Sequence, residues 1–363
     1  MNRAECYTHT RNYGCRLRRY LWNGVEMLSL ENQKVKVVLA LGKGADIVEF
    51  VHKATDTDFM WHSFNELKNI RHIPTVAPSA GNFLDSYAGG WQELFPTYGG
   101  RADYHGAEIG IHGEACLYPW DCTVLEDTPD CVEVLLTLRT IRSPFLLEKR
   151  ASLRWNDPSL YLRQKVTNLG SCGQSFMWGH HPAFGFPFLD SSVRLHLEGT
   201  PVVTVPAGTI AHRCPFAEET SGPWPTLPDR EGNELDLSRA YAPEDRMYME
   251  YAVSGLQEGR YELINHNRGL GMRMTWDLSV FRYLWVWGLY CGIDEYPWYG
   301  RSYVMAVEPW SSMPGDYAAC RDNGSLLQLE AGDSMETWIT AEAFETGVDP
   351  EKGAEQKCRK CGL

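Results

Sequence analysis

The sequence predicts an all-β protein built from antiparallel strands, with few short helices. Many short segments alternate apolar and polar residues, which is the pattern of a strand with one buried face. The chain also contains 13 Trp, 18 Tyr and 33 Gly, a composition that suits strands and tight turns better than a helical bundle. Helical patterns with recognisable caps are scarce.

The first alternating segments cover residues 35–42 and 45–52, with a Gly-rich turn between them. A longer meander follows over residues 131–141, 146–155 and 160–170. Its connections, "RSPF" and "NDPS", contain the residues that favour turns. We therefore expect three consecutive strands paired as neighbours.

The last third of the chain continues the β pattern. Further strand candidates cover residues 260–267, 270–277, 282–290, 302–310, 325–330 and 335–344. By contrast, residues 201–246 are rich in Pro, Gly and acidic residues, so loops are expected there, with a single short turn near Leu237. The prediction is one catalytic domain over residues 1–347 and a polar C-terminal tail over 348–363.

The net charge limits the kinds of partner that the protein could bind, and the cysteine content indicates its compartment. The formal net charge is −13, which disfavours nucleic acids and anionic membranes. The first twenty residues lack a continuous apolar run, so no signal peptide is expected, and 11 scattered cysteines favour reduced thiols in a cytoplasmic protein. Cys358 and Cys361 have metal-ligand spacing, but a lone pair cannot complete a zinc site, so no metal is predicted.

Familiar catalytic motifs are absent from the sequence. It has no Gly-rich phosphate loop ending in Lys-Ser or Lys-Thr, no Gly-x-Ser-x-Gly elbow and no His-Glu-x-x-His helix. The stretch "WGHHPAFGFPFL" instead places His180 and His181 side by side. Adjacent residues of a strand point to opposite faces, so these two histidines are expected to have different roles.

Three short segments place a titratable group among glycines and aromatic residues. The first covers residues 89–120 and contains "GGWQELFPTYGG" and His112. The second is "GHHPAFG". The third is "VMAVEPW", in which Glu308 ends an apolar strand. Taken singly, each has an ordinary structural explanation. A buried histidine is usually a hydrogen-bonded core residue, and a glutamate at a strand end is usually solvated.

In order along the chain, "WQELFP…HGEACLYPW", "GHHPAFG" and "AVEPW" resemble the aldose 1-epimerase (galactose mutarotase) superfamily. The resemblance covers roughly residues 34–345. It implies a β-supersandwich of the galactose mutarotase type with a site in a groove on one face. It also implies that His181, before Pro182, is the general acid, Glu308 the general base and His112 a sugar-binding residue.

Other sugar contacts are proposed less directly. Trp91, Gln92 and Trp287 could present an aromatic face and hydroxyl partners to a pyranose, and Arg71 is a candidate for the arginine that the family carries early in the chain. The family's substrate-binding aspartate has no clear counterpart, although Asp236 and Asp245 lie in the right region. These departures leave the identity of the sugar open.

The reaction implied by the resemblance needs no metal, nucleotide, covalent intermediate or other cofactor. Exchanging α and β anomers takes one base at the anomeric hydroxyl and one acid at the ring oxygen, and each contributes typically ~10²–10⁴-fold. A histidine must be protonated to act as the acid. Negative charge near the groove, including Glu308, is therefore expected to raise the pKa of His181.

Three alternatives remain open. The chain could bind carbohydrate without turning it over, or act on a sugar phosphate, although Arg282 and Arg301 are isolated candidates for a phosphate site. A glycoside hydrolase would need two facing carboxylates, for which Glu93, Glu114 and Asp294 are available. In each case the partner is a small sugar, and the protein is expected to be a monomer or homodimer.

Overall fold

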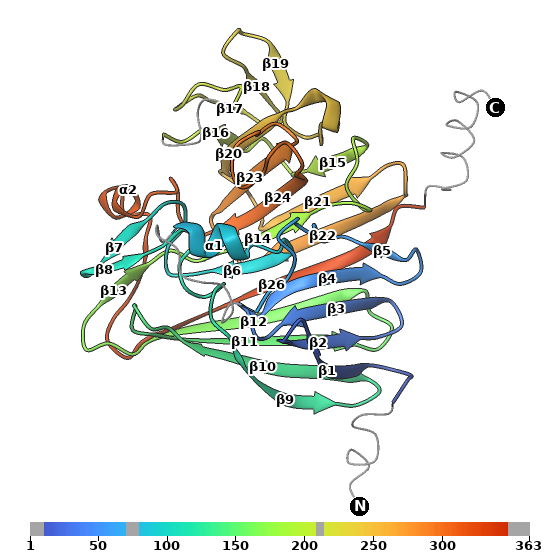
Figure 1. Cartoon of the computed structure of the whole chain (residues 1–363). Coiled ribbons are helices and arrows are strands. Elements are labelled where there is room, and N and C mark those ends of the chain that lie inside the picture. Colours follow the sequence, from blue (N-terminus) through green and yellow to red (C-terminus); the bar gives the residue numbers. More distant parts are fainter. Residues whose placement is uncertain (1–10, 70–79, 208–213, 348–363) are drawn as a thin grey trace, which may run out of the picture.

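Two large antiparallel sheets face each other in the computed structural model, which describes residues 11–69, 80–207 and 214–347 (Figure 1). The first is a twelve-stranded sheet. Its strands in spatial order are β1 (Arg16–Trp22), β2 (Val25–Glu31), β3 (Val35–Ala40), β4 (Asp46–His52), β6 (Trp91–Leu94), β14 (Gly179–Phe184), β24 (Tyr303–Trp310), β23 (Tyr283–Tyr290), β20 (Tyr248–Ser254), β16 (Val202–Thr204) and β17 (Ser221–Pro223), with β5 (Thr57–Asp58) beside β4.

The second is an eight-stranded sheet. Its strands are β15 (Val193–His196), β21 (Arg260–Asn265), β22 (Leu270–Trp276), β26 (Ser334–Glu345), β12 (Ser159–Asn168), β11 (Phe145–Arg154), β10 (Cys131–Arg139) and β9 (Asp121–Asp127). Three strand pairs lie outside both sheets: β7 (Ala102–Tyr104) with β8 (Ala107–Ile109), β13 (Gln174–Phe176) with β25 (Leu327–Leu329), and β18 (Thr226–Pro228) with β19 (Glu234–Asp236). Helical segments are short: α1 (Ala80–Ser86), η3 (Pro243–Asp245, a 3₁₀ helix) and α2 (Tyr317–Asp322).

The all-β prediction is confirmed, and the meander expected over residues 131–170 is β10, β11 and β12 in consecutive antiparallel pairing. The prediction of loops over residues 201–246 is wrong in part. That stretch contains β16, β17, β18 and β19, each three residues long, and the helix η3. Three residues are too few to display the alternation by which a strand is recognised in a sequence.

The alternation in the long strands creates the core. Along β10 every second residue is buried, and most buried apolar side chains of both sheets join one hydrophobic cluster, beside a small second one on β2 and β3. Three tryptophans, Trp178, Trp276 and Trp310, are among its largest fully buried members. Apolar area removed from water is worth about 25 cal/mol per Å², so this interior is the main favourable contribution to folding.

Buried polar groups also link the two sheets. Lys149 Nζ on β11 lies 3.0 Å from Glu93 Oε2 on β6, and the Trp178 indole donates to Glu93 Oε1 at 2.9 Å. Burial would raise the pKa of Glu93, but the nearby Lys149 ammonium and His180 hold it below its ordinary value. The Lys149 ammonium also lies over the Trp120 ring. This ion pair fixes β6 against the facing sheet.

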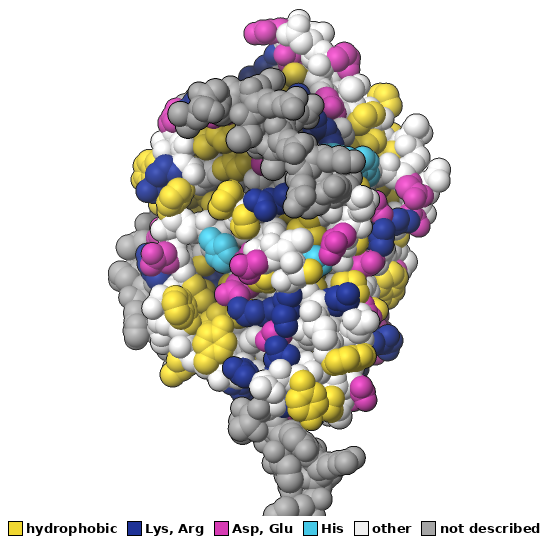
Figure 2. Space-filling model, turned by 90° about the vertical axis from the view of Figure 1, so that its right-hand side faces the viewer, with side chains coloured by type: hydrophobic (Ala, Val, Ile, Leu, Met, Phe, Trp, Pro, Cys, Tyr) yellow, Lys and Arg dark blue, Asp and Glu magenta, His cyan; other side chains and the backbone are white. Residues whose placement is uncertain are grey.

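Figure 2 shows the surface at one end of the strands, where basic, acidic and hydrophobic side chains lie interspersed. Each of the eight cysteines in the described residues is a free thiol. No helix in the described part of the chain is both long and apolar enough to cross a membrane.

Candidate active site

Strand register brings the two predicted catalytic side chains together. On β14, His181 pairs with Gln92 of β6, while Glu308 of β24 pairs with Trp285 of β23. The β14–β24 pairs Gly179↔Trp310 and Ala183↔Ala306 flank His181 and Glu308 symmetrically, so these two residues lie opposite each other. Directly opposite residues of neighbouring strands project from the same face of a sheet.

That face is the outer one, turned away from the eight-stranded sheet. The adjacent His180 points inward, where its Nδ1 accepts from the Trp91 indole at 3.0 Å and its Nε2 lies 3.0 Å from Gln164 Oε1 of β12. The expectation that the two histidines have different roles therefore agrees with their positions. His180 joins the two sheets, and burial lowers its pKa to about 3.

His181 and Glu308 line a cavity of about 480 Å³, within the size range of small-molecule sites. Helix α1 and several loops form its walls above the sheet. Its lining is mainly aromatic: Phe83, Tyr87, Tyr98, Tyr248, Trp285, Trp287, Tyr296 and Trp298. Besides tyrosines, its titratable lining residues are His112, His181, Glu250, Glu308 and Asp316. Such a mixture can hold an apolar ring face and several hydroxyls together.

The Glu308 carboxylate is held at both oxygens. Its Oε1 lies 3.5 Å from His181 Nε2, and its Oε2 accepts from the Trp310 indole at 3.1 Å. Trp310 can take this position because residue 179 is glycine. A Cβ at Gly179 would come within 2.2 Å of the indole ring. The strand sequences thus fix the direction of the carboxylate into the cavity.

Burial sets the protonation of the pair. The Glu308 side chain is 1% exposed and that of His181 is 6% exposed. Burial raises the pKa of Glu308 well above its ordinary value, and Glu250 adds to the rise, while the Trp310 hydrogen bond opposes it. Burial also lowers the pKa of His181 to about 4. The expectation that nearby carboxylates raise the pKa of His181 is therefore wrong, because desolvation by burial is the largest cause and lowers it.

Tyr87, which follows helix α1, orients His181. Its hydroxyl lies 3.4 Å from His181 Nδ1, and the two rings meet edge to face with centroids 5.6 Å apart. Burial raises the pKa of Tyr87 well above its ordinary value, with a further contribution from Glu308, so the phenol stays protonated. A contact at Nδ1 leaves the opposite ring nitrogen, Nε2, directed toward Glu308.

His112 approaches the same cavity from a strained loop. Its φ is 63° and that of Gly113 is 81°, in the left-handed region that favours glycine. The His112 ring packs on Phe83 and lies 5.6 Å from the His181 ring, and its Nδ1 has no hydrogen-bond partner. Burial lowers the pKa of His112 well below its ordinary value, and His181 contributes to the shift. A neutral imidazole with an unpaired nitrogen is suited to a sugar hydroxyl.

The proposed sugar contacts divide into those near the cavity and those away from it. Trp287 lines the cavity, with its ring 5.8 Å from that of His181. Gln92 shares the face of His181 but is fully buried, and its amide donates to Asp46 and Gly89. Trp91 points to the opposite face, where it donates to His180, so the expectation that it contacts sugar is corrected by the alternation of β6. Arg71 lies outside the described residues.

Several residues that line the cavity could not be identified from the sequence. Glu250, on β20, accepts from the Tyr248 hydroxyl and lies opposite Trp287 on β23. Trp298 packs against Trp287 with ring centroids 5.2 Å apart. Tyr248 and Glu250 are two residues apart, and this spacing in a strand is the one signal that could have placed them on a common face. Asp236 and Asp245 are not among the residues that line the cavity.

The carboxylates considered for a hydrolase do not meet at this site. Glu93 is the inward-facing partner of Lys149. Glu114 accepts from the backbone of Ile141 and Arg142, and Asp294 pairs with Arg246 on the surface. Across the described ranges, no cluster of three or more His, Cys, Asp or Glu side chains is arranged to hold a metal ion.

Comparison with solved structures shows the fold. A provisionally named aldose 1-epimerase from Klebsiella pneumoniae superposes with a TM-score of 0.69 at 14% identity, over 96% of this chain and 91% of the other. A galactose mutarotase-like protein from Lactobacillus casei gives 0.60 at 20% identity, over 88% and 100%. The Slr1438 protein of Synechocystis gives 0.61 at 17% identity, over 93% and 99%. No curated protein matches the chain by sequence.

The model of one sequence family, described as "Domain of unknown function (DUF4432)", matches residues 22–343. This match covers nearly all of both sheets and the whole of the cavity's described lining. The chain therefore belongs to the DUF4432 family and has the galactose mutarotase-like fold.

Proposed function

We propose that the protein is an aldose 1-epimerase that interconverts the α and β anomers of a free aldohexose. The observation that carries the proposal is the facing pair of His181 and Glu308, 3.5 Å apart in a cavity with aromatic walls. A binding protein needs no such acid–base pair. The solved relatives named as aldose 1-epimerases or mutarotase-like proteins support the same reaction class.

In the proposed reaction, Glu308 removes the proton from the anomeric hydroxyl while His181 Nε2 donates a proton to the ring oxygen. The bond between the ring oxygen and the anomeric carbon breaks, and a free aldehyde forms. Rotation about the bond to that carbon exposes its other face, and the same two groups return the protons in reverse. Both groups end in their starting state, so no external proton donor is consumed.

The protonation of His181 and Glu308 is compatible with these roles. Between the lowered pKa of His181, about 4, and the raised pKa of Glu308, the pair shares one proton, and burial favours its place on Glu308. Sugar hydroxyls that donate to the carboxylate favour its ionised form, and the proton then passes to His181 across the 3.5 Å gap. One proton on the pair is what the reaction requires.

The remaining lining would hold the sugar. The Trp287 and Trp298 rings offer aromatic faces for the C–H groups of a pyranose, and His112 Nδ1 offers a hydrogen-bond partner to a hydroxyl. Among the described residues that line the cavity there is no Lys or Arg. This composition favours an uncharged sugar over a sugar phosphate, which is usually held by such cations.

Polarimetry tests the proposal. Freshly dissolved α-D-glucose and α-D-galactose should reach equilibrium faster with the protein than without it, and the Glu308→Gln and His181→Asn variants should each lose ~10²–10⁴-fold of the acceleration. Glu234→Gln, an exposed carboxylate outside the cavity, is the matched control. If every tested sugar keeps its spontaneous rate while calorimetry detects binding, the protein is a carbohydrate-binding module.

Hydrolysis of a glycoside is the second candidate, favoured by the presence of both Glu250 and Glu308 in one cavity. Glycosidases work with two such carboxylates on either side of the scissile bond. Release of reducing ends from an oligosaccharide, lost in both Glu250→Gln and Glu308→Gln, would establish it. Mutarotation of monosaccharides without any release of reducing ends would exclude it.

A further inference from the structure

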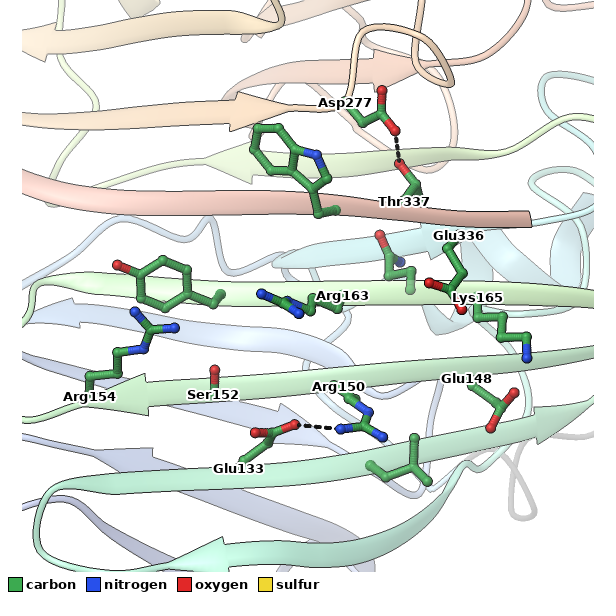
Figure 3. A pocket seen from close by; sticks show the side chains of 14 residues that line it. Glu133, Glu148, Arg150, Ser152, Arg154, Arg163, Lys165, Asp277, Glu336 and Thr337 are labelled. Carbon is green, nitrogen blue, oxygen red and sulfur yellow. Dashed lines mark hydrogen bonds and ion pairs between the residues drawn. The ribbon is translucent and has the colours of Figure 1, made fainter. Parts of the chain in front are cut away.

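A second groove lies on the other side of the molecule. It has a volume of about 890 Å³ and runs over the outer face of the eight-stranded sheet, across β10, β11, β12 and β26 (Figure 3). The sugar cavity opens on the outer face of the twelve-stranded sheet, so both sheets separate the two sites. We refer to this second site as the outer groove.

Strand register divides the charges of the outer groove into two ends. At one end Lys165 pairs with Glu336 on one neighbouring strand and with Glu148 on the other, so its charge has opposite charges directly across on both sides. Opposite charges in directly paired positions stabilise a sheet. At this end of the outer groove the register therefore places opposite charges, and no like charges, in directly paired positions.

At the other end of the outer groove the register places like charges in directly paired positions. Arg163 of β12 pairs directly with Arg150 of β11, and Arg154 lies further along β11 on the same face. Like charges directly opposite each other destabilise a sheet. Only Arg150 has a carboxylate partner, Glu133 at 3.3 Å; Arg154 and Arg163 form no ion pair within the described part of the chain. By register, this arginine end holds three guanidinium groups and Glu133, whereas the whole lining of the outer groove has four cationic and four acidic side chains.

Aromatic side chains flank the three arginines. Trp338 pairs with Arg163 and is 44% exposed, and the Arg154 guanidinium lies over the Tyr161 ring at 4.4 Å. In Figure 3 Ser152 lies between Arg154 and Arg150, with Arg163 on the neighbouring strand above it and Glu133 below it. A guanidinium fork binds carboxylates in a bidentate manner, and an exposed indole stacks on the apolar face of a sugar ring.

We propose that the outer groove binds an acidic oligosaccharide, whose carboxylates contact Arg163, Arg150 and Arg154 while one sugar ring stacks on Trp338. The open groove across four strands suits an extended chain better than a single small ion. The arginine end supplies the charge, and the exposed indole supplies the selectivity for a ring. The site is independent of the sugar cavity and of the reaction proposed for it.

Titration calorimetry with trigalacturonate tests the proposal on the full chain, with neutral galactotriose as the matched probe. We expect trigalacturonate to bind with an affinity that falls as salt is added, and galactotriose to bind at least tenfold more weakly. Arg163→Gln should weaken binding roughly 10–100-fold, since it removes charge-assisted hydrogen bonds, and Arg163→Lys should recover part of the loss. Trp338→Ala should weaken it as well.

Lys165→Gln is the matched control, because it removes the same charge from the end of the groove where the register places Glu148 and Glu336 opposite Lys165. It should change the affinity less than Arg163→Gln does. Glu308→Gln should bind trigalacturonate as the wild type does, which assigns the binding to the outer groove. Equal effects of Arg163→Gln and Lys165→Gln, equal affinity for galactotriose, displacement by inorganic sulfate at the same concentration, or no binding up to about 10 mM would each overturn the proposal.

Discussion

The neighbouring histidines allow one experiment in which the same substitution is made on two faces of one strand. His180→Phe should destabilise the protein with little direct effect on chemistry, whereas His181→Phe should abolish most of the activity with little effect on stability. Both residues are buried and both changes introduce the same ring. The difference between the outcomes therefore reports which face each side chain occupies.

The magnitudes follow from the contacts of each ring. His180 makes two hydrogen bonds of 3.0 Å, with the Trp91 indole and with Gln164. Phenylalanine would leave both buried partners unsatisfied, at about 1–3 kcal/mol each, so a loss of about 2–6 kcal/mol in unfolding free energy is expected. His181 makes only contacts of 3.4 and 3.5 Å, and its replacement should change the unfolding free energy by less than about 1 kcal/mol.

Urea unfolding and polarimetry measure the two effects on the same preparations. His181→Phe should lower the rate of mutarotation ~10²–10⁴-fold while its urea midpoint stays near that of the wild type. His180→Phe should show a clear drop in midpoint and, at low temperature where it remains folded, a rate within a few-fold of the wild type. A reversal, in which His180→Phe loses the rate and keeps its stability, would refute the assigned faces.

Three further outcomes are expected. Gly113→Ala should lower stability and activity together, because the φ of Gly113 is 81° and a Cβ there would come within 2.2 Å of Phe95 O. Circular dichroism melting and polarimetry measure the two effects. A variant with unchanged stability and activity would contradict the expected backbone strain. Lys149→Met should lower the unfolding free energy by about 3–5 kcal/mol, because it leaves Glu93 buried without its ion-pair partner. In a double-mutant cycle, adding Glu93→Gln should restore part of this loss, and simple additivity of the two changes would argue against the pair. The pKa of His180 is lowered to about 3 in the folded protein, so between about pH 6.5 and 3 the unfolded state binds one more proton. The unfolding free energy should therefore fall by up to about 1.4 kcal/mol per pH unit as the pH drops through this range. Urea midpoints that change equally in the wild type and in His180→Phe would oppose this.

Much of the fold could be predicted because long strands carry their own signal. The meander from β10 to β12 alternates over nine or ten residues per strand, and its predicted bounds differ from the observed ones by at most two residues. The short strands of the 201–246 stretch were missed, since neighbouring strands and not their own sequences hold them in place.

The candidate site was predictable only where a residue type is rare in its surroundings. His112, His181 and Glu308 stand out among glycines and aromatic residues, whereas Tyr87 and Glu250 resemble ordinary strand or loop residues until the sheet pairs them with the rest. Trp91 shows the opposite error. It neighbours Gln92 in sequence, but only one of two adjacent strand residues can share a face with His181.

The proposed acid–base pair comes from β14 and β24, which are adjacent in the middle of the twelve-stranded sheet, so the candidate site depends on the integrity of the whole sheet. A protease that cuts the chain ahead of β24 would remove both the carboxylate and a central strand. Any mutarotase activity would then be lost together with the folded structure. The activity measured in a preparation would therefore report the fraction of molecules that are intact.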